Sequence, residues 1–231
     1  MEAIRVHVGH VATFCERLFL ALLSFEFAAG KYKMFLENTV NHKHHTGWVE
    51  VICGSMFSGK TEELLRRLNR ALIGKQKVEI FKPSVDKRYH DSQVVSHDNK
   101  AVSSTVVESA ENILLHVSQD VDVVGIDEAQ FFDDAIIEVV NDLANRGIRV
   151  VIAGLDMDFE GKPFGPMPHL MAIAEYVTKV HAICVHTGNL AHYSHRTVAD
   201  QKKVLLGEKN EYEPVSRAAF NKLRENQKKK E

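Results

Sequence analysis

The residues in this chain that most clearly suggest chemistry form one run of eight: Gly54, Ser55, Met56, Phe57, Ser58, Gly59, Lys60 and Thr61. The run fits G-x-x-x-x-G-K-[ST], the pattern of a loop that wraps the phosphates of a nucleoside triphosphate. Its glycines let backbone N–H groups turn toward phosphate oxygens, and the N-terminus of a following helix adds a favourable dipole. We expect Lys60 to reach the β- and γ-phosphates and the Thr61 hydroxyl to ligate Mg²⁺.

A pair of carboxylates follows an apolar run further along the chain. Residues 121–126 are typical of a buried strand, and Asp127 and Glu128 come directly after it. We expect this strand to lie next to the strand that precedes the phosphate loop, so that Asp127 holds Mg²⁺ through water. Glu128 would then lie beside the γ-phosphate, where it can take a proton from a nucleophile. Spacing alone leaves two classes open, an ATPase that activates water and a kinase that activates a substrate hydroxyl.

Strands and helices alternate around these motifs. Apolar runs predict strands at residues 49–53, 78–82, 121–126, 148–153 and 180–185, and helical periodicity marks residues 61–73, 108–117, 133–145 and 166–179. Weaker signals indicate strands near residues 94–95 and 102, a small hairpin at 191–198 and 203–206, and a short basic tail from 217. The alternation predicts an α/β fold, a P-loop parallel sheet flanked by helices.

Five ordered segments resemble those of the type II thymidine kinases, a P-loop family of bacteria, animals and poxviruses: GSMFSGKTEELLRR, FKPSVDKRY, SHD, DEAQFF and AGLDMDFEGKPFGPM. The resemblance runs from about residue 48 to residue 220. It implies transfer of the ATP γ-phosphate, with Mg²⁺, to the 5′-hydroxyl of thymidine and usually deoxyuridine, giving dTMP for DNA synthesis by salvage. The alternatives are a kinase of shifted specificity and a non-catalytic nucleotide-binding P-loop protein.

The same resemblance implies roles for individual residues. Glu128 matches the general base, Thr61 and Asp127 match the Mg²⁺ ligands, and Arg88 matches an arginine whose charge would offset negative charge developing on the phosphates. The ATP and phosphate site would comprise Gly54, Ser55, Met56, Phe57, Ser58, Gly59, Lys60, Thr61, Arg88, Asp127, Glu128, Ala129 and Gln130.

A nucleoside pocket is the second site that the resemblance implies. Its members would be Met56, Phe131, Leu155, Phe159, Phe164, Ser194 and Tyr212. A flat apolar slot suits a methylated pyrimidine, although from burial statistics alone the apolar members are more often core residues. A lasso loop over residues 188–212 would close over the nucleoside and read the base largely with backbone groups.

The family usually holds the base of the lasso with zinc bound by two C-x-x-C pairs. Here the matching positions are Cys184, Thr187, Ser216 and Ala219, so three thiolates are missing. Thr, Ser and Ala do not replace zinc thiolates, and we therefore expect no structural zinc and a lasso held by packing. The alternative is a rebuilt site that uses Cys184 with nearby histidines, which are His181, His186, His192 and His195.

The whole chain of 231 residues is ordinary in composition. It is 45% hydrophobic and 26% charged, enough for one sizeable core or a core with an appendage. A net charge of −2 argues against a large nucleic-acid footprint, and three widely spaced cysteines suggest a reducing compartment. No apolar run approaches the roughly 18 residues of a membrane span, so we expect a cytoplasmic protein.

Four regions are expected: an N-terminal extension at residues 1–47, a P-loop kinase domain at 48–183, a small lasso or zinc-ribbon-like domain at 184–220, and a basic tail at 221–231. The extension contains an apolar stretch at residues 18–29 that is close to a signal-peptide core. The other interpretation is that translation begins at Met34 and that residues 1–33 are an overlong start or a private extension, and an extra helix is a further alternative. Family likeness further implies a homotetramer that is inhibited by dTTP.

Overall fold

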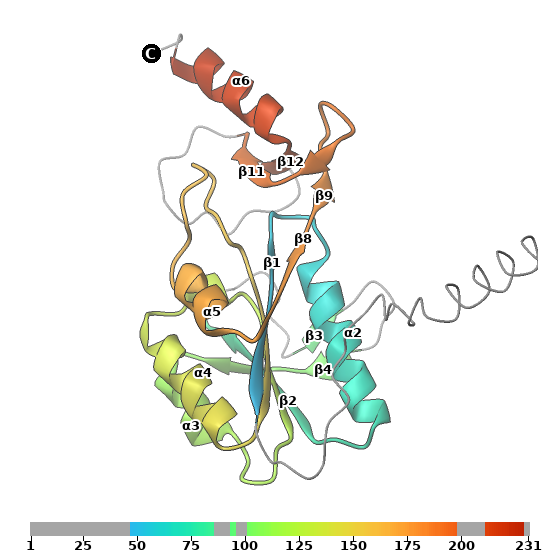
Figure 1. Ribbon diagram of the computed structural model, residues 1–231, viewed down its shortest axis with the longest axis vertical. Helices are drawn as coiled ribbons and strands as arrows, with labels where there is room; N and C mark the ends of the chain where they lie inside the picture. Colours follow the sequence, from blue (N-terminus) through green and yellow to red (C-terminus); the bar gives the residue numbers. More distant parts are fainter. Residues whose placement is uncertain (1–46, 86–92, 96–100, 198–210, 229–231) are drawn as a thin grey trace, which may run out of the picture. The chain divides into compact units, whose positions relative to one another are not determined.

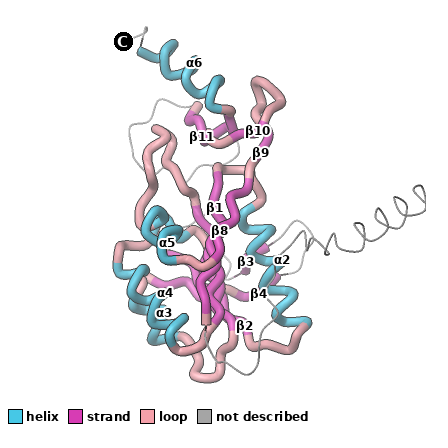
Figure 2. Tube along the Cα trace, viewed as in Figure 1, coloured by secondary structure: helices cyan, strands magenta, loops and turns pink. Residues whose placement is uncertain are grey.

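The computed structural model describes residues 47–85, 93–95, 101–197 and 211–228 (Figures 1 and 2). Contacts divide the chain into two units, Met1–Lys43 and His44–Glu231, and all described residues belong to the second. The expected N-terminal extension therefore lies almost wholly outside the described residues, and so does Arg88.

Six parallel strands form the central sheet, in the order β5-β2-β6-β7-β1-β8. Their bounds are β1 (Trp48–Gly54), β2 (Val78–Pro83), β5 (Thr105–Val107), β6 (Val123–Ile126), β7 (Arg149–Gly154) and β8 (Tyr176–Val180). Strand β1 pairs with β7 from Trp48 opposite Arg149 to Cys53 opposite Gly154. The predicted parallel α/β fold is confirmed, because the apolar strands are buried on both faces as such a sheet requires.

Helices cover both faces of this sheet (Figure 1). Helix α2 (Lys60–Ile73) lies on one face, and α3 (Glu111–His116), α4 (Ala135–Asn145) and α5 (Met167–Ile173) lie on the other. Alternation along β1 divides the core, because Ile52 packs with the leucines of α2 whereas Val51 joins the cluster under α3, α4 and α5. The carboxyl ends of the strands thus meet at one edge, above a well-packed core.

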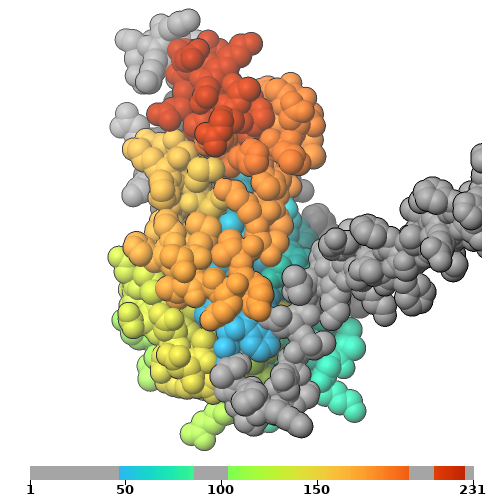
Figure 3. All heavy atoms as spheres, in the orientation of Figure 1, coloured from blue at the N-terminus to red at the C-terminus, as the bar shows by residue number. Residues whose placement is uncertain are grey.

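The C-terminal elements form a separate layer, which we call the lasso module (residues 182–197 and 211–228). Strand β9 (Ala182–Ile183) pairs with β10 (Leu190–Ala191), β11 (Tyr193–Arg196) pairs with β12 (Tyr212–Val215), and helix α6 (Arg217–Lys228) follows. Tyr193 stacks on Phe220 at 4.4 Å within a small apolar cluster. Figure 3 shows the red atoms of α6 gathered at one end, over the loop after β7.

Three expectations about elements were wrong. The helix expected at residues 166–179 ends at Ile173, because the β-branched residues that follow pair with β1 as the edge strand β8. Strand β5 appears where only a helix beginning at residue 108 was expected. The expected tail from residue 217 is helix α6, which crosses the expected boundary at residue 220.

The short strands were partly anticipated. β3 (Gln93–Val95) and β4 (Ala101–Ser103) form the antiparallel pair that the weak signals indicated. In the expected hairpin, β11 pairs with β12, whereas residues 203–206 lie outside the described residues. None of the helices in the described ranges combines the length and apolarity needed to cross a bilayer.

Candidate active site

The phosphate loop (residues 54–61) connects β1 to α2, as the motif predicts. A Cβ at Gly54 would lie 2.1 Å from the carbonyl oxygen of Val180 in β8, so the close approach of the edge strand excludes any side chain there. Lys60 Nζ donates to the Ser55 carbonyl at 2.8 Å, and Ser58 Oγ donates to the same oxygen at 2.7 Å. The first bond holds the Lys60 ammonium against the phosphate loop, and the second closes the turn within the loop.

Asp127 directly follows β6, and it faces the start of α2. The expectation that β6 lies beside β1 was wrong, because β7 lies between them. The two motifs still meet, since α2 crosses β7 and places Thr61 Oγ1 3.2 Å from Asp127 Oδ2 and 3.4 Å from Oδ1. Burial, followed by the charge of Glu128, raises the pKa of Asp127 to about 7. A hydroxyl and a carboxylate at this spacing suit a magnesium ion.

Glu128 adopts an unusual backbone conformation. Its φ is +53° and its ψ is +40°, the left-handed region that a non-glycine residue occupies at a cost. Its N–H donates to Asp127 Oδ1 at 2.9 Å, and the short helix η1 (Ala129–Phe131) follows. The tight turn separates the two carboxylates, one directed to Thr61 and the other to Gln130.

Gln130 contacts the Glu128 carboxylate. Gln130 was expected among the phosphate-binding residues, and the residue is only 2% exposed. Its Nε2 donates to Glu128 Oε2 at 2.5 Å, and its Oε1 accepts the Leu155 N–H at 2.9 Å. The amide therefore bridges the expected base and the expected nucleoside pocket.

The five apolar side chains expected in the nucleoside pocket are all half-buried. They are Met56, Phe131, Leu155, Phe159 and Phe164. None belongs to an apolar core cluster of the described residues. Phe131 and Phe164 meet edge to face at 5.7 Å between ring centroids. The partial exposure of these side chains favours the pocket interpretation over a core one.

The lasso module contacts this region through β11 and β12. Ser194 Oγ accepts the Met56 N–H at 2.9 Å, which joins the module to the phosphate loop. Buried Arg196 donates to the Tyr212 hydroxyl at 2.7 and 3.2 Å, and its guanidinium lies 3.7 Å from the Phe159 ring centroid. Arg196 was not among the expected site residues, although its two-residue spacing from Ser194 predicts the same strand face.

The positions where the family has zinc cysteines come together here with different chemistry. Thr187 Oγ1 donates to Ser216 Oγ at 3.3 Å, and Ser216 Oγ accepts the Ala219 N–H at 3.4 Å as a cap of α6. Burial raises the pKa of Cys184, but hydrogen bonds from Thr187, Ser216 and the His186 N–H lower it to about 6. One thiol with hydroxyls does not fit zinc.

The nearby histidines do not complete such a site. His181 and His192 meet edge to face at 4.5 Å, and His186 pairs with Glu213 at 2.8 Å. In the ranges that the structure describes, no three Cys, His, Asp or Glu side chains come close enough together to hold a metal ion. The zinc-free lasso remains a prediction, which the donor chemistry supports.

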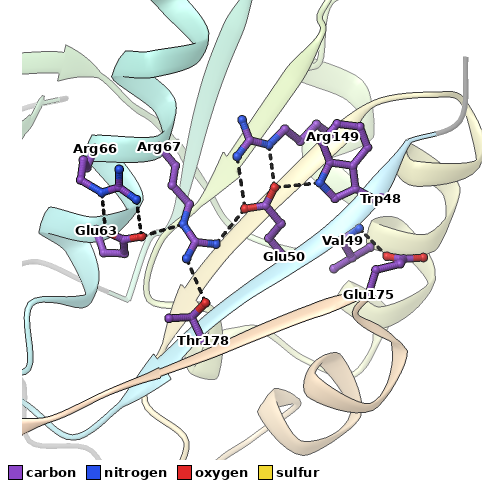
Figure 4. Close-up of polar contacts among 9 residues, drawn as sticks. All are labelled: Trp48, Val49, Glu50, Glu63, Arg66, Arg67, Arg149, Glu175 and Thr178. Atoms are coloured by element: carbon purple, nitrogen blue, oxygen red, sulfur yellow. Dashed lines mark hydrogen bonds and ion pairs between the residues drawn. The ribbon is translucent and has the colours of Figure 1, made fainter. Parts of the chain in front are cut away.

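A buried ion network joins the phosphate-loop strand to its helix (Figure 4). Glu50 of β1 accepts bonds from Arg67 of α2 at 2.7 Å, Arg149 of β7 at 2.7 and 3.2 Å, and Trp48 Nε1 at 2.7 Å. Arg67 also donates to Thr178 of β8 at 2.9 Å. Three elements, β1, α2 and β7, therefore meet at the Glu50 carboxylate, and Arg67 extends the network to β8.

The fold and this site define a P-loop enzyme that uses a nucleoside triphosphate. A model of the thymidine kinase family matches residues 47–220. The chain is 59% identical to a thymidine kinase of Bacteroides thetaiotaomicron over 83% of this chain and 96% of that relative. It is 60% identical to a thymidine kinase of Porphyromonas gingivalis, over 81% and 91% of the two chains. The chain belongs to the thymidine kinase family.

Proposed function

We propose that this chain transfers the γ-phosphate of ATP to the 5′-hydroxyl of thymidine, and of deoxyuridine, to form dTMP or dUMP. The observation that carries the proposal is the division between two adjacent carboxylates. Asp127 faces Thr61 at the phosphate loop, whereas Glu128 is joined through Gln130 to Leu155 of the expected pocket. A kinase needs this arrangement, with one carboxylate for the metal and one for the substrate hydroxyl.

In the reaction, the phosphate loop and Lys60 bind the triphosphate, and Thr61 and Asp127 would hold Mg²⁺. Bound Mg²⁺ would offset the negative charge on the phosphate oxygens. Glu128 accepts the proton of the 5′-hydroxyl while the nucleoside 5′-oxygen attacks the γ-phosphorus. The bond between the γ-phosphorus and the bridging oxygen of the β-phosphate breaks, and ADP leaves. Arg88 would offset charge on the transferred group.

The nucleoside would lie between the half-buried apolar side chains and the lasso module. Ser194 and Tyr212 support this placement, because their contacts join the module to Met56 and, through Arg196, to Phe159. Family likeness supports three further proposals: a homotetramer, inhibition by dTTP, and a cytoplasmic location. It also supports a kinase domain near residues 48–183 followed by a lasso domain that continues into α6.

The test is ATP-dependent phosphorylation of thymidine, deoxyuridine and deoxycytidine, with a reaction lacking nucleoside as the blank. We expect Glu128→Ala to lower kcat about 10²- to 10⁴-fold while ATP binding persists. Glu138→Ala, on the exposed side of α4, is the matched control and keeps wild-type turnover. Unchanged kcat in Glu128→Ala would remove Glu128 from the base role, and ATP binding without any nucleoside phosphorylation would favour a non-catalytic protein.

A further inference from the structure

The Gln130 amide has a fixed orientation. An amide side chain offers one acceptor oxygen and two N–H donors, and neighbouring groups decide which end faces which partner. The Leu155 backbone N–H can only donate, so it fixes Oε1 at 2.9 Å and directs Nε2 to the Glu128 carboxylate at 2.5 Å. The Leu155 N–H in the expected nucleoside pocket therefore determines that Gln130 presents its Nε2 donor to Glu128, the expected general base.

The space around the amide is shaped to hold it. A Cβ on Gly154 would lie 2.9 Å from Gln130 Oε1 and 2.6 Å from Met167 Sδ, so a larger residue there would displace the amide or the methionine. Gln130 is 2% exposed, and a buried amide without these partners would be costly. The packing keeps the side chain against Glu128 and away from solvent.

The placement of the Glu128 carboxylate depends on the groups around it. Its backbone is in the left-handed region at the end of β6, and a half-buried carboxylate on such a turn has several accessible rotamers. General-base catalysis requires the carboxylate to lie within hydrogen-bond reach of the proton that it removes. The short hydrogen bond from Gln130 favours the placement in which Glu128 Oε2 faces the amide.

We propose that Gln130 is a positioning residue that orients the Glu128 carboxylate toward the substrate hydroxyl and couples it to the pocket loop at Leu155. This role rests on the proposed function, in which Glu128 is the base. It differs from the phosphate-binding role that the family likeness implies for Gln130. Because one amide bonds both partners, a nucleoside that orders the Leu155 backbone also orders the Glu128 carboxylate.

The test is steady-state kinetics on two variants of matched size. Gln130→Met removes both hydrogen bonds, whereas Gln130→Glu keeps an oxygen for the Leu155 N–H but sets a carboxylate against Glu128. We expect kcat to fall up to about 100-fold in each, with both KM values within about twofold of wild type. Gln119→Met, at an exposed site beyond α3, is the matched control and keeps wild-type kcat.

A double-mutant cycle separates positioning from a merely structural effect. In a Glu128→Gln background, adding Gln130→Met should change kcat by less than about threefold, because the base that it orients is already lost. An equal fold-loss in both backgrounds would overturn the proposal, and so would a raised KM for ATP at unchanged kcat. A wild-type chain that forms no dTMP overturns the proposed function itself, whereas an active wild type with an unchanged kcat in Gln130→Met overturns only the role of Gln130.

Discussion

The clearest prediction about stability concerns Glu50, because its one buried carboxylate pairs with two arginines. Its side chain accepts bonds from Arg67, Arg149 and Trp48, and the residue is 7% exposed. Glu50→Gln keeps the shape but removes the negative charge beside the half-buried Arg149 guanidinium, and it leaves buried Arg67 with Glu63 as its carboxylate partner. Breaking a buried pair in this way costs about 3 to 5 kcal/mol, and the amide oxygen retained by Gln favours the lower end. For a chain of this size the expected fall in Tm is roughly 6 to 12 °C.

The same residue gives the stability a defined pH dependence. Burial alone would raise the pKa of Glu50, but hydrogen bonds and charge from Arg149, with Trp48 and Arg67, lower it below its ordinary value of 4.5. A carboxyl whose folded pKa is depressed contributes stability above the unfolded pKa and loses it as pH falls through the folded pKa. The stability gap between wild type and Glu50→Gln should therefore be full at pH 7 and narrow below about pH 4.5.

Thermal and urea unfolding at pH 7 and at several lower pH values measure both effects. Asp120→Asn is the control for the acid-to-amide change, because Asp120 pairs with Lys77 in solvent, and its Tm should move by less than about 2 °C. A loss below about 1 kcal/mol for Glu50→Gln, or a gap that stays constant in acid, would refute this account of the network.

Two further predictions concern the lasso module. Arg196→Ala should raise the KM for thymidine about tenfold with little change in the KM for ATP, because the substitution removes the side chain that connects Phe159 to Tyr212. A selective change in ATP kinetics would contradict this. Exhaustive chelation should leave Tm unchanged, whereas Ser216→Ala should lower it by about 2 to 4 °C through loss of the cap at α6, and a chelator-sensitive Tm would instead show a bound metal.

The functional residues that follow strands β1 and β6 were predictable from the sequence. The phosphate loop is a local backbone pattern, and its glycines and lysine act within eight consecutive residues. The same holds for Asp127 and Glu128, since an acid after a buried apolar strand lies at a sheet edge whatever the strand order. Alternation of strands and helices then predicted the parallel sheet, because βαβ connections leave few other arrangements.

The partners of these residues were not predictable in the same way. The order that places β7 between β1 and β6 depends on helix crossovers, and it was expected wrongly. The residues of edge strand β8 were expected to be the end of a helix. They form a strand because they pair with β1 and approach Gly54 closely, and neither contact is visible in the local sequence. Local periodicity carries no information about which strand will be the neighbour.

Glu50, Gln130 and Arg196 mark the boundary between local motifs and long-range packing. The family, the phosphate loop and the two carboxylates could be predicted from residue order, because short motifs encode backbone shape and functional groups together. The folded chain was needed to learn that Glu50 is buried against arginines, that Gln130 bonds Glu128 and Leu155, and that Arg196 joins Phe159 to Tyr212. The physical reason is that most of these contacts join segments distant along the chain, and the fold must first bury a polar side chain before its hydrogen-bond partner matters.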